Sequence, residues 1–302
     1  MGEYFVGLAG TATGEKLALI LALLSAFAHA VFAALNKHGH DPYLNRGAIN
    51  VAYSIMAAPF ALFVFPLPER FLIPVLFASF VMHLAYEWMQ SAAFLKGAFT
   101  LVYPIARGTG PLVTAILAIF VFSENLEWGQ WAGLVLLSGA IISLAGVNLQ
   151  EKGVDDHLKQ ALLPSIVLAI GAGIAVALYT TVDAYGIRIT ADPFTFLAWF
   201  FFLGGFGFPV VAFQRYKKME NKPPLRPLIV RGFTGAFIAF FSFAMLMLAT
   251  RIGKVSEAAA LRETSIIFAT AIGVIFFKEK VGASKLGIIG LIALGAILVE
   301  FA

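Results

Sequence analysis

The sequence of 302 residues contains no cysteine and few charged side chains. The absence of cysteine excludes disulfides, thiol catalysis and cysteine-based metal sites. Only 13% of the residues are charged, whereas soluble domains have about one quarter. No polar stretch is long enough for a soluble domain, and the net charge of +4 does not indicate a nucleic-acid surface. A cleavable signal peptide is not expected, because Glu3 stands where such a peptide needs positive charge.

Apolar residues make up 60% of the chain, and the mean hydropathy is +0.89. A helix that crosses the hydrocarbon core needs about 20 apolar residues at 1.5 Å rise each. Ten such runs are present, and their connections are short. The spans are expected at Leu17–Leu35, Ala48–Phe65, Ile73–Phe94, Leu101–Phe122, Trp128–Asn148, Leu162–Val182, Phe194–Phe213, Phe233–Ala249, Val255–Phe277 and Leu286–Phe301. The pattern predicts an all-α polytopic membrane protein with ten transmembrane helices.

Lysine and arginine are distributed unevenly between the two sides of the predicted bundle. The terminal side is defined by the N-terminus and every second connection, and it has five of the 21 basic residues; the opposite side has fourteen. Six of those fourteen lie in the expected loop Gln214–Gly232. Because positively charged loops resist translocation, the opposite side is expected to be cytoplasmic. The expected location is the plasma (inner) membrane of a bacterium.

The two halves of the chain repeat each other at a shift of 155 residues. The shift superposes Arg107 on Arg262 and Glu124 on Glu279, with no gap in that stretch. Residues 1–150 and 151–302 then contain five spans each. Since five is odd, the second half enters the membrane inverted relative to the first. Inverted repeats of this kind are typical of alternating-access carriers, with the substrate site between the halves near the midplane.

Four segments carry a family resemblance over essentially the whole chain. They are VYPIARGTGPLVTAILAIFVFSENL, ALRETSIIFATAIGVIFFKEKV and the glycine-rich WAGLVLLSGAIISLAG and LGIIGLIALGAIL. Together with the five-plus-five layout, they resemble the EamA branch of the drug/metabolite transporter superfamily. The resemblance implies a ten-helix secondary carrier, often an exporter of amino acids or small metabolites. It does not imply one substrate.

The fourth span contains Arg107 at membrane depth, flanked by Pro104 and Pro111. A guanidinium stays charged at any useful pH, and placing one in the bilayer centre costs at least about 2.5 kcal/mol. Proline removes a backbone donor, so the helix is expected to loosen beside the charge. We therefore expect Arg107 to face an interior cavity.

In the ninth span, Arg262 lies opposite Arg107 by the repeat, and Glu263 follows it. Adjacent residues on a helix point about 100° apart, so Arg262 and Glu263 are not expected to pair with each other. One arginine from each half is suited to bind a carboxylate or phosphate of the substrate. The alternative is structural, with each arginine holding helix carbonyls or a neighbouring carboxylate.

The third span adds Glu87, with His83 one helical turn earlier. Glu87 is expected to pair with Arg107, to bind a cationic group or to accept a proton, unless it lies at the membrane interface. A buried, hydrogen-bonded histidine is the plain interpretation of His83. Tyr103 and Trp88 are further candidate wall residues, although aromatic residues often anchor helices at the interface.

The first span of each half ends in polar residues. Asn36 and Tyr179 are candidates for one mouth of the cavity, and Asp183 is equally consistent with a solvated helix end. The complete set of expected substrate-binding residues is Arg107, Arg262, Glu87, Glu263, Tyr103, His83, Trp88, Asn36 and Tyr179.

The residues thus predict a carrier rather than an enzyme. No serine, histidine and carboxylate set has hydrolase spacing, and His38 and His40 lack a third ligand, so neither a catalytic site, a metal nor a cofactor is expected. The expected partners are a small-molecule substrate and the lipid bilayer, with coupling to a proton or to exchange; Glu87 and Glu263 are the candidate proton or cation sites. The rivals are a scaffold subunit that transports nothing, a lipid-modifying intramembrane enzyme, and a channel.

Overall fold

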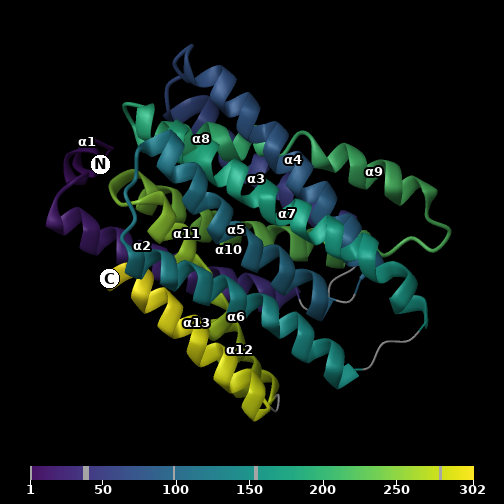
Figure 1. The fold of residues 1–302 in the computed structure, drawn as a ribbon. Helices are drawn as coiled ribbons and strands as arrows, with labels where there is room; N and C mark the ends of the chain where they lie inside the picture. The colour runs from purple at the N-terminus through teal and green to yellow at the C-terminus, as the bar shows by residue number, and fades with distance from the viewer. Residues whose placement is uncertain (1, 37–40, 98, 153–155, 279–280) are drawn as a thin grey trace.

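The computed structural model describes residues 2–36, 41–97, 99–152, 156–278 and 281–302. Within these residues every regular element is a helix. Ten segments are long and apolar enough to cross a membrane. The predicted fold class, an all-α protein with ten candidate transmembrane helices, is confirmed. Figure 1 shows the helices packed lengthwise in one bundle, with both termini at the same end.

The helices follow the chain without long interruptions. Their bounds are α1 Gly2–Leu8, α2 Ala12–Asn36, α3 Pro42–Pro59, the π-helical turn η1 Phe60–Val64, α4 Leu72–Lys96, α5 Phe99–Phe122, α6 Trp128–Lys152, α7 Asp156–Ile189, α8 Pro193–Gly204, α9 Phe208–Lys218, α10 Leu225–Ile252, α11 Val255–Arg262, α12 Ser265–Phe277 and α13 Ala283–Phe301. The second, seventh and ninth spans are each made of two consecutive elements: α3 with η1, α8 with α9, and α11 with α12.

Several helices are longer than the sequence pattern indicates, because polar residues continue them. Asp41 accepts hydrogen bonds from two backbone amides of the first turn of α3, with Pro42 at the first helical position. Proline at that position loses no helical hydrogen bond, so α3 starts before the expected Ala48. As a result Arg46 lies inside a span, and its assignment to a loop is wrong. Likewise α7 continues to Ile189, which places Asp183 within the helix.

The expected basic loop Gln214–Gly232 is also largely helical. The helix α9 continues to Lys218, and α10 starts at Leu225, so the connection is much shorter than predicted. Long lysine and arginine side chains are good helix formers, which lets the helices extend past the apolar residues.

The break in the helix path lies in the second half rather than beside Arg107. The helix α5 runs unbroken through Pro104 and Pro111, so the predicted loosening is wrong. Each proline deletes only one backbone hydrogen bond, and the close packing of α5 against α6, α7 and α11 maintains the helix. The ninth span instead changes direction at Glu263 and Thr264, between α11 and α12, where the backbone makes shorter i→i+3 hydrogen bonds.

Close helix contacts depend on small residues. The helices α6 and α13 pack along their lengths, and α4 with α7 and α2 with α10 form two further close pairs. A side chain added at Gly133 would meet the backbone oxygen of Gly295 at 2.8 Å, and one added at Gly295 would meet the backbone of Leu137 at 2.8 Å. Lipid chains are as apolar as the helix surfaces, so the hydrophobic effect does not drive helices together within the bilayer. Close packing of the two backbones provides van der Waals contacts that hold the helices together instead.

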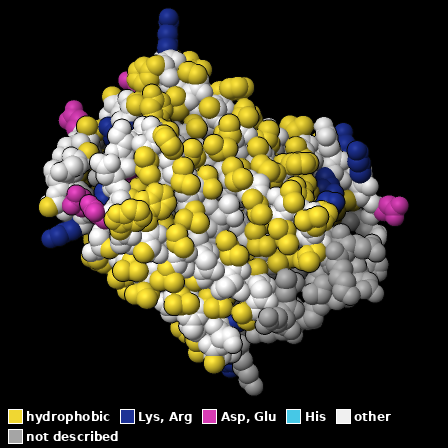
Figure 2. Space-filling model, viewed as in Figure 1, with side chains coloured by type: hydrophobic (Ala, Val, Ile, Leu, Met, Phe, Trp, Pro, Cys, Tyr) yellow, Lys and Arg dark blue, Asp and Glu magenta, His cyan; other side chains and the backbone are white. Residues whose placement is uncertain are grey.

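Apolar side chains cover the outside of the bundle. Figure 2 shows them spread across the visible face, with lysine, arginine, aspartate and glutamate gathered towards its margins. Large side chains such as Phe63, Phe120 and Phe276 are at least 75% exposed. This surface suits a helix bundle that sits in a hydrocarbon layer.

Candidate functional site

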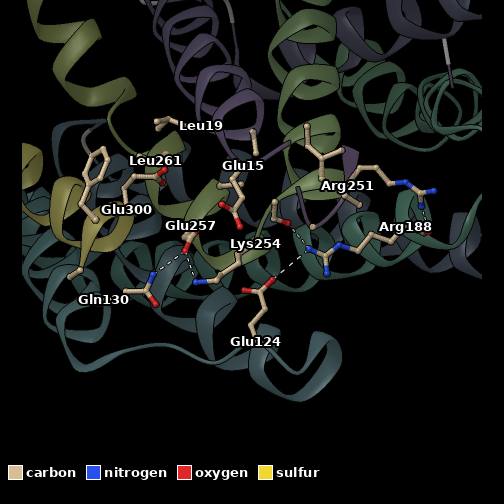
Figure 3. A pocket seen from close by; sticks show the side chains of 18 of the residues that line it. Glu15, Leu19, Glu124, Gln130, Arg188, Arg251, Lys254, Glu257, Leu261 and Glu300 are labelled. Atoms are coloured by element: carbon tan, nitrogen blue, oxygen red, sulfur yellow. Dashed lines mark hydrogen bonds and ion pairs between the residues drawn. The ribbon is translucent and has the colours of Figure 1, made fainter. Parts of the chain in front are cut away.

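A cavity of about 920 Å³ opens at the end of the bundle that carries both termini. Its walls come from α1, α2, α11 and α13 and from the ends of α5, α7 and α10. Figure 3 shows side chains from these elements converging on it. The charged lining consists of Glu15, Glu124, Arg188, Arg251, Lys254, Glu257 and Glu300. A mixed set of charges makes this space suitable for water and polar solutes.

One polar network joins three helices at the cavity mouth. Gln130 of α6 donates hydrogen bonds to Glu257 of α11, at 2.9 Å, and to the carbonyl of Val299 in α13, at 3.0 Å. Lys254 forms an ion pair with Glu257 at 2.8 Å. Burial lowers the pKa of Lys254, but the hydrogen bond to Glu257 and the surrounding carboxylates outweigh burial and raise the pKa above its usual value. Lys254 therefore stays charged at neutral pH.

Glu124 positions the start of α11. Its carboxylate accepts hydrogen bonds from the amides of Val255 and Ser256 and from the Ser256 hydroxyl. A carboxylate at a helix N-terminus satisfies amides that have no partner within the helix. Arg188 lies 3.6 Å from Glu124 and donates to the carbonyls of Thr250 and Gly253. The ends of α5, α7, α10 and α11 are thereby tied together.

Arg107 of α5 and Glu263, at the inner end of α11, lie in contact. Arg107 Nε lies 2.8 Å from Glu263 Oε2, and Nη2 donates to the Ser265 hydroxyl at 3.2 Å. Nε and Oε2 are not aligned as a hydrogen bond, so the contact is an ion pair. Tyr103 lies under the same guanidinium, at 5.9 Å from the ring centroid. Both charges are buried, with 5% and 3% exposure. Arg107 thus pairs with Glu263 and not with Glu87.

Arg262 has a different environment. Its guanidinium lies over the ring of Phe243 in α10, 4.5 Å from the centroid, and its side chain is buried. Nε has no hydrogen-bond partner. In the part of the chain that the structure describes, no carboxylate lies within ion-pair distance of Arg262. Since Arg107 and Glu263 neutralise each other, the helix break carries a net charge of +1.

Arg262 lies between two cavities. Ala258 and Leu261 line the large cavity, and Arg262 follows Ala258 by one helical turn on α11. Phe243, which carries the guanidinium, lines a second and much smaller cavity of about 40 Å³. That cavity lies towards the opposite side of the bundle, between α3, α4, α8 and α10. Arg262 therefore sits between a wide space at one side and a narrow one at the other.

Glu87 lies in the wall of the small cavity, held by residues of α3. Asn50 donates to Glu87 Oε2 at 2.8 Å, and Arg46 Nε lies 4.0 Å from Oε1. Arg46 also donates to Gln90 at 3.1 Å and lies over the ring of Tyr86. The interface interpretation of Glu87 does not fit this arrangement, because the carboxylate is only 8% exposed.

His83 and Asp183 form a second polar group beside the same cavity. His83 Nε2 lies 2.8 Å from Asp183 Oδ2, and Ser79 donates to Oδ1 at 2.5 Å. The His83 ring stacks on Tyr179 at 4.0 Å, and Tyr179 contacts Tyr86 edge-on at 5.2 Å. The plain interpretation of a buried, hydrogen-bonded histidine describes this geometry.

One of the expected site residues, Trp88, is not brought to this region. Trp88 follows Glu87 by one position, so it points away from it, and its side chain is 51% exposed on the outside of α4. Asn36 ends α2, but its side chain lies outside the described residues, as do Lys37, His38 and His40. Within the described residues no group of three histidine, aspartate or glutamate side chains is arranged to hold a metal ion.

Sequence reasoning overlooked several residues that the fold brings into the site. Arg46 was counted as a loop charge, and Ser79 and Phe243 were not considered at all. A capping aspartate followed by proline at 41 and 42 was a signal for placing Arg46 inside a helix. The pairing of Asp183 with His83 had no signal in the sequence, because it depends on the contact between α4 and α7.

Comparisons with known proteins give one family match and one similar fold. A family model described as the EamA-like transporter family matches residues 163–301. A solved crystal structure is similar to the chain with a TM-score of 0.72 and 15% identity, over 95% of this chain and 96% of the other. An identity this low shows a shared fold alone. No curated protein matches the chain.

Proposed function

We propose that the protein is a secondary carrier of a small polar metabolite and a member of the drug/metabolite transporter superfamily, which the match of residues 163–301 to the EamA-like transporter family supports. The substrate class is an amino acid or related organic ion. Transport is by alternating access, and the direction is export or exchange. The protein lies in the plasma membrane of a bacterium, with the terminal side outside.

The contacts between helices support two inverted repeats, 1–150 and 151–302. Under the proposed repeat, α2 corresponds to α7 and α4 to α10. The contact of α4 with α7 then has its counterpart in the contact of α10 with α2, and α6 packs against its own counterpart, α13. Reciprocal contacts of this kind are what a pseudo-two-fold axis in the membrane plane produces. The halves can rock against each other along these shared faces.

The observation that carries the proposal is the asymmetry of access around Arg262. The large cavity reaches α11 from the terminal side, whereas the cavity towards the opposite side has a volume of only about 40 Å³. A site that is open to one side and closed to the other is the arrangement that a carrier needs at each end of its cycle. A continuous channel is disfavoured, because the buried ion pair of Arg107 and Glu263 and the aromatic side chains block the path.

The charge at the helix break supports a substrate with an anionic group. Burying a net charge is costly unless a counter-charge joins it. A planar guanidinium stacked on Phe243 presents its donors in the geometry that a carboxylate accepts. We assign Arg262 to this group, with Arg107, Glu263, Tyr103, His83, Tyr179 and Glu87 as the surrounding wall. The single positive charge matches a single carboxylate.

Direct drive by ATP is not part of the proposal, since no segment is large enough for a nucleotide-binding domain. The drive is a proton gradient or exchange of one substrate for another. A scaffold subunit that transports nothing predicts neither saturable binding nor an effect of the Arg262 charge on flux.

The test uses purified protein and two matched arginine variants. Thermal shift with the standard amino acids and short-chain carboxylates identifies a ligand, and uptake of that compound is then measured in liposomes. Arg262→Gln should lower its affinity by about tenfold or more, because a hydrogen bond to a charged group contributes about 1.5–3 kcal/mol. Arg226→Gln, exposed at the start of α10, should leave affinity unchanged. If neither binding nor saturable uptake of any compound is found, the scaffold interpretation replaces the carrier.

A further inference from the structure

Asp183 differs from the other buried carboxylates of the described residues in its partners. Glu87, Glu124 and Glu263 each lie within 4.0 Å of an arginine. An arginine keeps its charge at any accessible pH, so it favours the ionised form of a carboxylate beside it. No arginine or lysine lies within ion-pair distance of Asp183 in the described part of the chain; its carboxylate contacts Ser79 and His83.

The geometry joins the two halves of the protein. Ser79 and His83 stand one helical turn apart on α4, so both reach the same carboxylate on α7. Asp183 is 3% exposed. The two hydrogen bonds occupy both carboxylate oxygens. Any change in this group therefore acts on the contact between the first half and the second.

Histidine is the side chain whose charge changes between about pH 5 and 8. We propose that His83 and Asp183 together bind the proton that couples transport, a role that rests on the proposed carrier function. The proton comes from bulk water and is held between His83 Nε2 and Asp183 Oδ2. It leaves to bulk water on the other side after the halves have moved. Glu87 and Glu263, expected from the sequence in this role, have arginine partners that retain their charge.

Ser79 and His83 both line the small cavity. From α8 and α10, the rings of Phe200 and Phe243 contact the histidine ring. The titratable and charged groups that face the pair from the remaining elements are Arg46, Tyr53, Tyr86, Glu87, Tyr179 and Arg262. Among the charged groups, Arg46 and Glu87 have opposite charges that offset each other. Arg262 therefore leaves a net charge of +1 near the pair.

The pair is linked to Arg262 through one aromatic ring. The His83 ring lies 6.1 Å from Phe243, which carries the Arg262 guanidinium at 4.5 Å. A proton on the pair adds positive charge near the place where the anion binds. Proton binding and anion binding therefore strengthen each other, and by linkage the effect is reciprocal. The carrier moves the anion and the proton in the same direction, so export carries an acid out with its proton.

The first experiment needs no substrate. Hydrogen-ion titration of the purified protein between pH 5 and 8 compares wild type with the double variant His83→Gln/Asp183→Asn. Wild type should take up more protons than the double variant across this range, because the variant removes both side chains that hold the proposed proton. The matched control Asp192→Asn, which alters the carboxylate that caps α8, should titrate like wild type. Equal proton uptake by wild type and the double variant would overturn the proposal.

The second experiment measures coupling in liposomes that contain a pH-sensitive dye, with the mixture of amino acids and carboxylates as the probe. Wild type should move protons together with substrate. Asp183→Asn should lose about tenfold or more of the proton flux while retaining exchange of substrate for substrate, because Asp183 is not among the residues assigned to the substrate wall. Asp192→Asn should retain both activities. Retained exchange also shows that the variants are folded.

Each outcome decides between the two proposals. If wild type carries substrate without proton movement at any pH, the proposed coupling role of His83 and Asp183 is wrong and the carrier function stands. If no compound is carried, both proposals are wrong. Should the two variants fail to fold, Ser79→Ala serves instead: it removes one hydrogen bond to Asp183 and should shift the pH midpoint of wild-type transport, and an unchanged midpoint would count against the pair.

Discussion

At the level of single residues, the two buried arginines that the repeat relates have different environments. Arg107 has an acidic partner, Glu263, whereas Arg262 has an aromatic one, Phe243. A buried ion pair is weak evidence for stability by itself, because desolvation offsets much of the attraction. Breaking it is costly, since one charge is then buried without compensation. This difference separates a structural arginine from one suited to a ligand.

The pair predicts a non-additive stability effect. Arg107→Gln should destabilise the protein by about 3–5 kcal/mol, because the carboxylate of Glu263 remains buried without its partner. The double variant Arg107→Gln/Glu263→Gln should recover most of that loss. Thermal unfolding in detergent of both single variants and the double variant measures the coupling. Additive effects would show that the two side chains do not interact.

At the level of elements, the contact between α6 and α13 depends on two glycines. Gly133 and Gly295 face each other so closely that a methyl group on either would meet backbone atoms at 2.8 Å. Backbone cannot move away as a flexible side chain can. The two helices must therefore separate to admit any larger residue.

A matched pair of substitutions on α6 tests this contact. Gly133→Ala should lower stability by about 1–3 kcal/mol, as expected for overpacking. Gly139→Ala on the same helix meets no atom within 4 Å and should be neutral or stabilising by up to about 1 kcal/mol. The measurement is the thermal midpoint of each purified variant. Similar midpoints for the two would mean that α6 and α13 are not in close contact.

At the level of the whole molecule, the two cavities define one conformational state. The large cavity is open on the terminal side, and the narrow one is bordered by Arg46, Glu87 and Gln90 on the other. In the proposed alternating-access cycle, these contacts open while the cavity around α11 closes. The network of Glu124, Arg188 and the start of α11 marks the place where closure would occur.

Cysteine labelling tests this state directly, because the chain has no cysteine of its own. Leu19→Cys places a partly exposed thiol in the wall of the large cavity, and Ala52→Cys places one in a packed cluster of α3. A membrane-impermeant maleimide added outside intact cells should label the first about tenfold faster or more, because only an accessible thiolate reacts. Labelling of Leu19→Cys only in inverted vesicles would reverse the proposed orientation.

The ten spans, the membrane environment and the charged positions Arg107, Arg262, Glu87 and Glu263 were predictable from the sequence. Long apolar runs and the rare charges within them are local features of the sequence. In a bilayer the runs form spanning helices, and the charges face the protein interior. Helix ends were less predictable, because caps such as Asp41 and Asp192 extend a helix beyond its apolar run.

Only the tertiary structure decided which charges meet. Arg107 pairs with Glu263 rather than with Glu87. Glu87 contacts Arg46 and Asn50, and Asp183 contacts His83. Each of these contacts joins side chains far apart in the chain, and each depends on the rotation and depth of two helices relative to each other. Periodicity within one helix carries no information on that rotation, so the partners, and with them the difference between Arg107 and Arg262, emerge only when the helices pack.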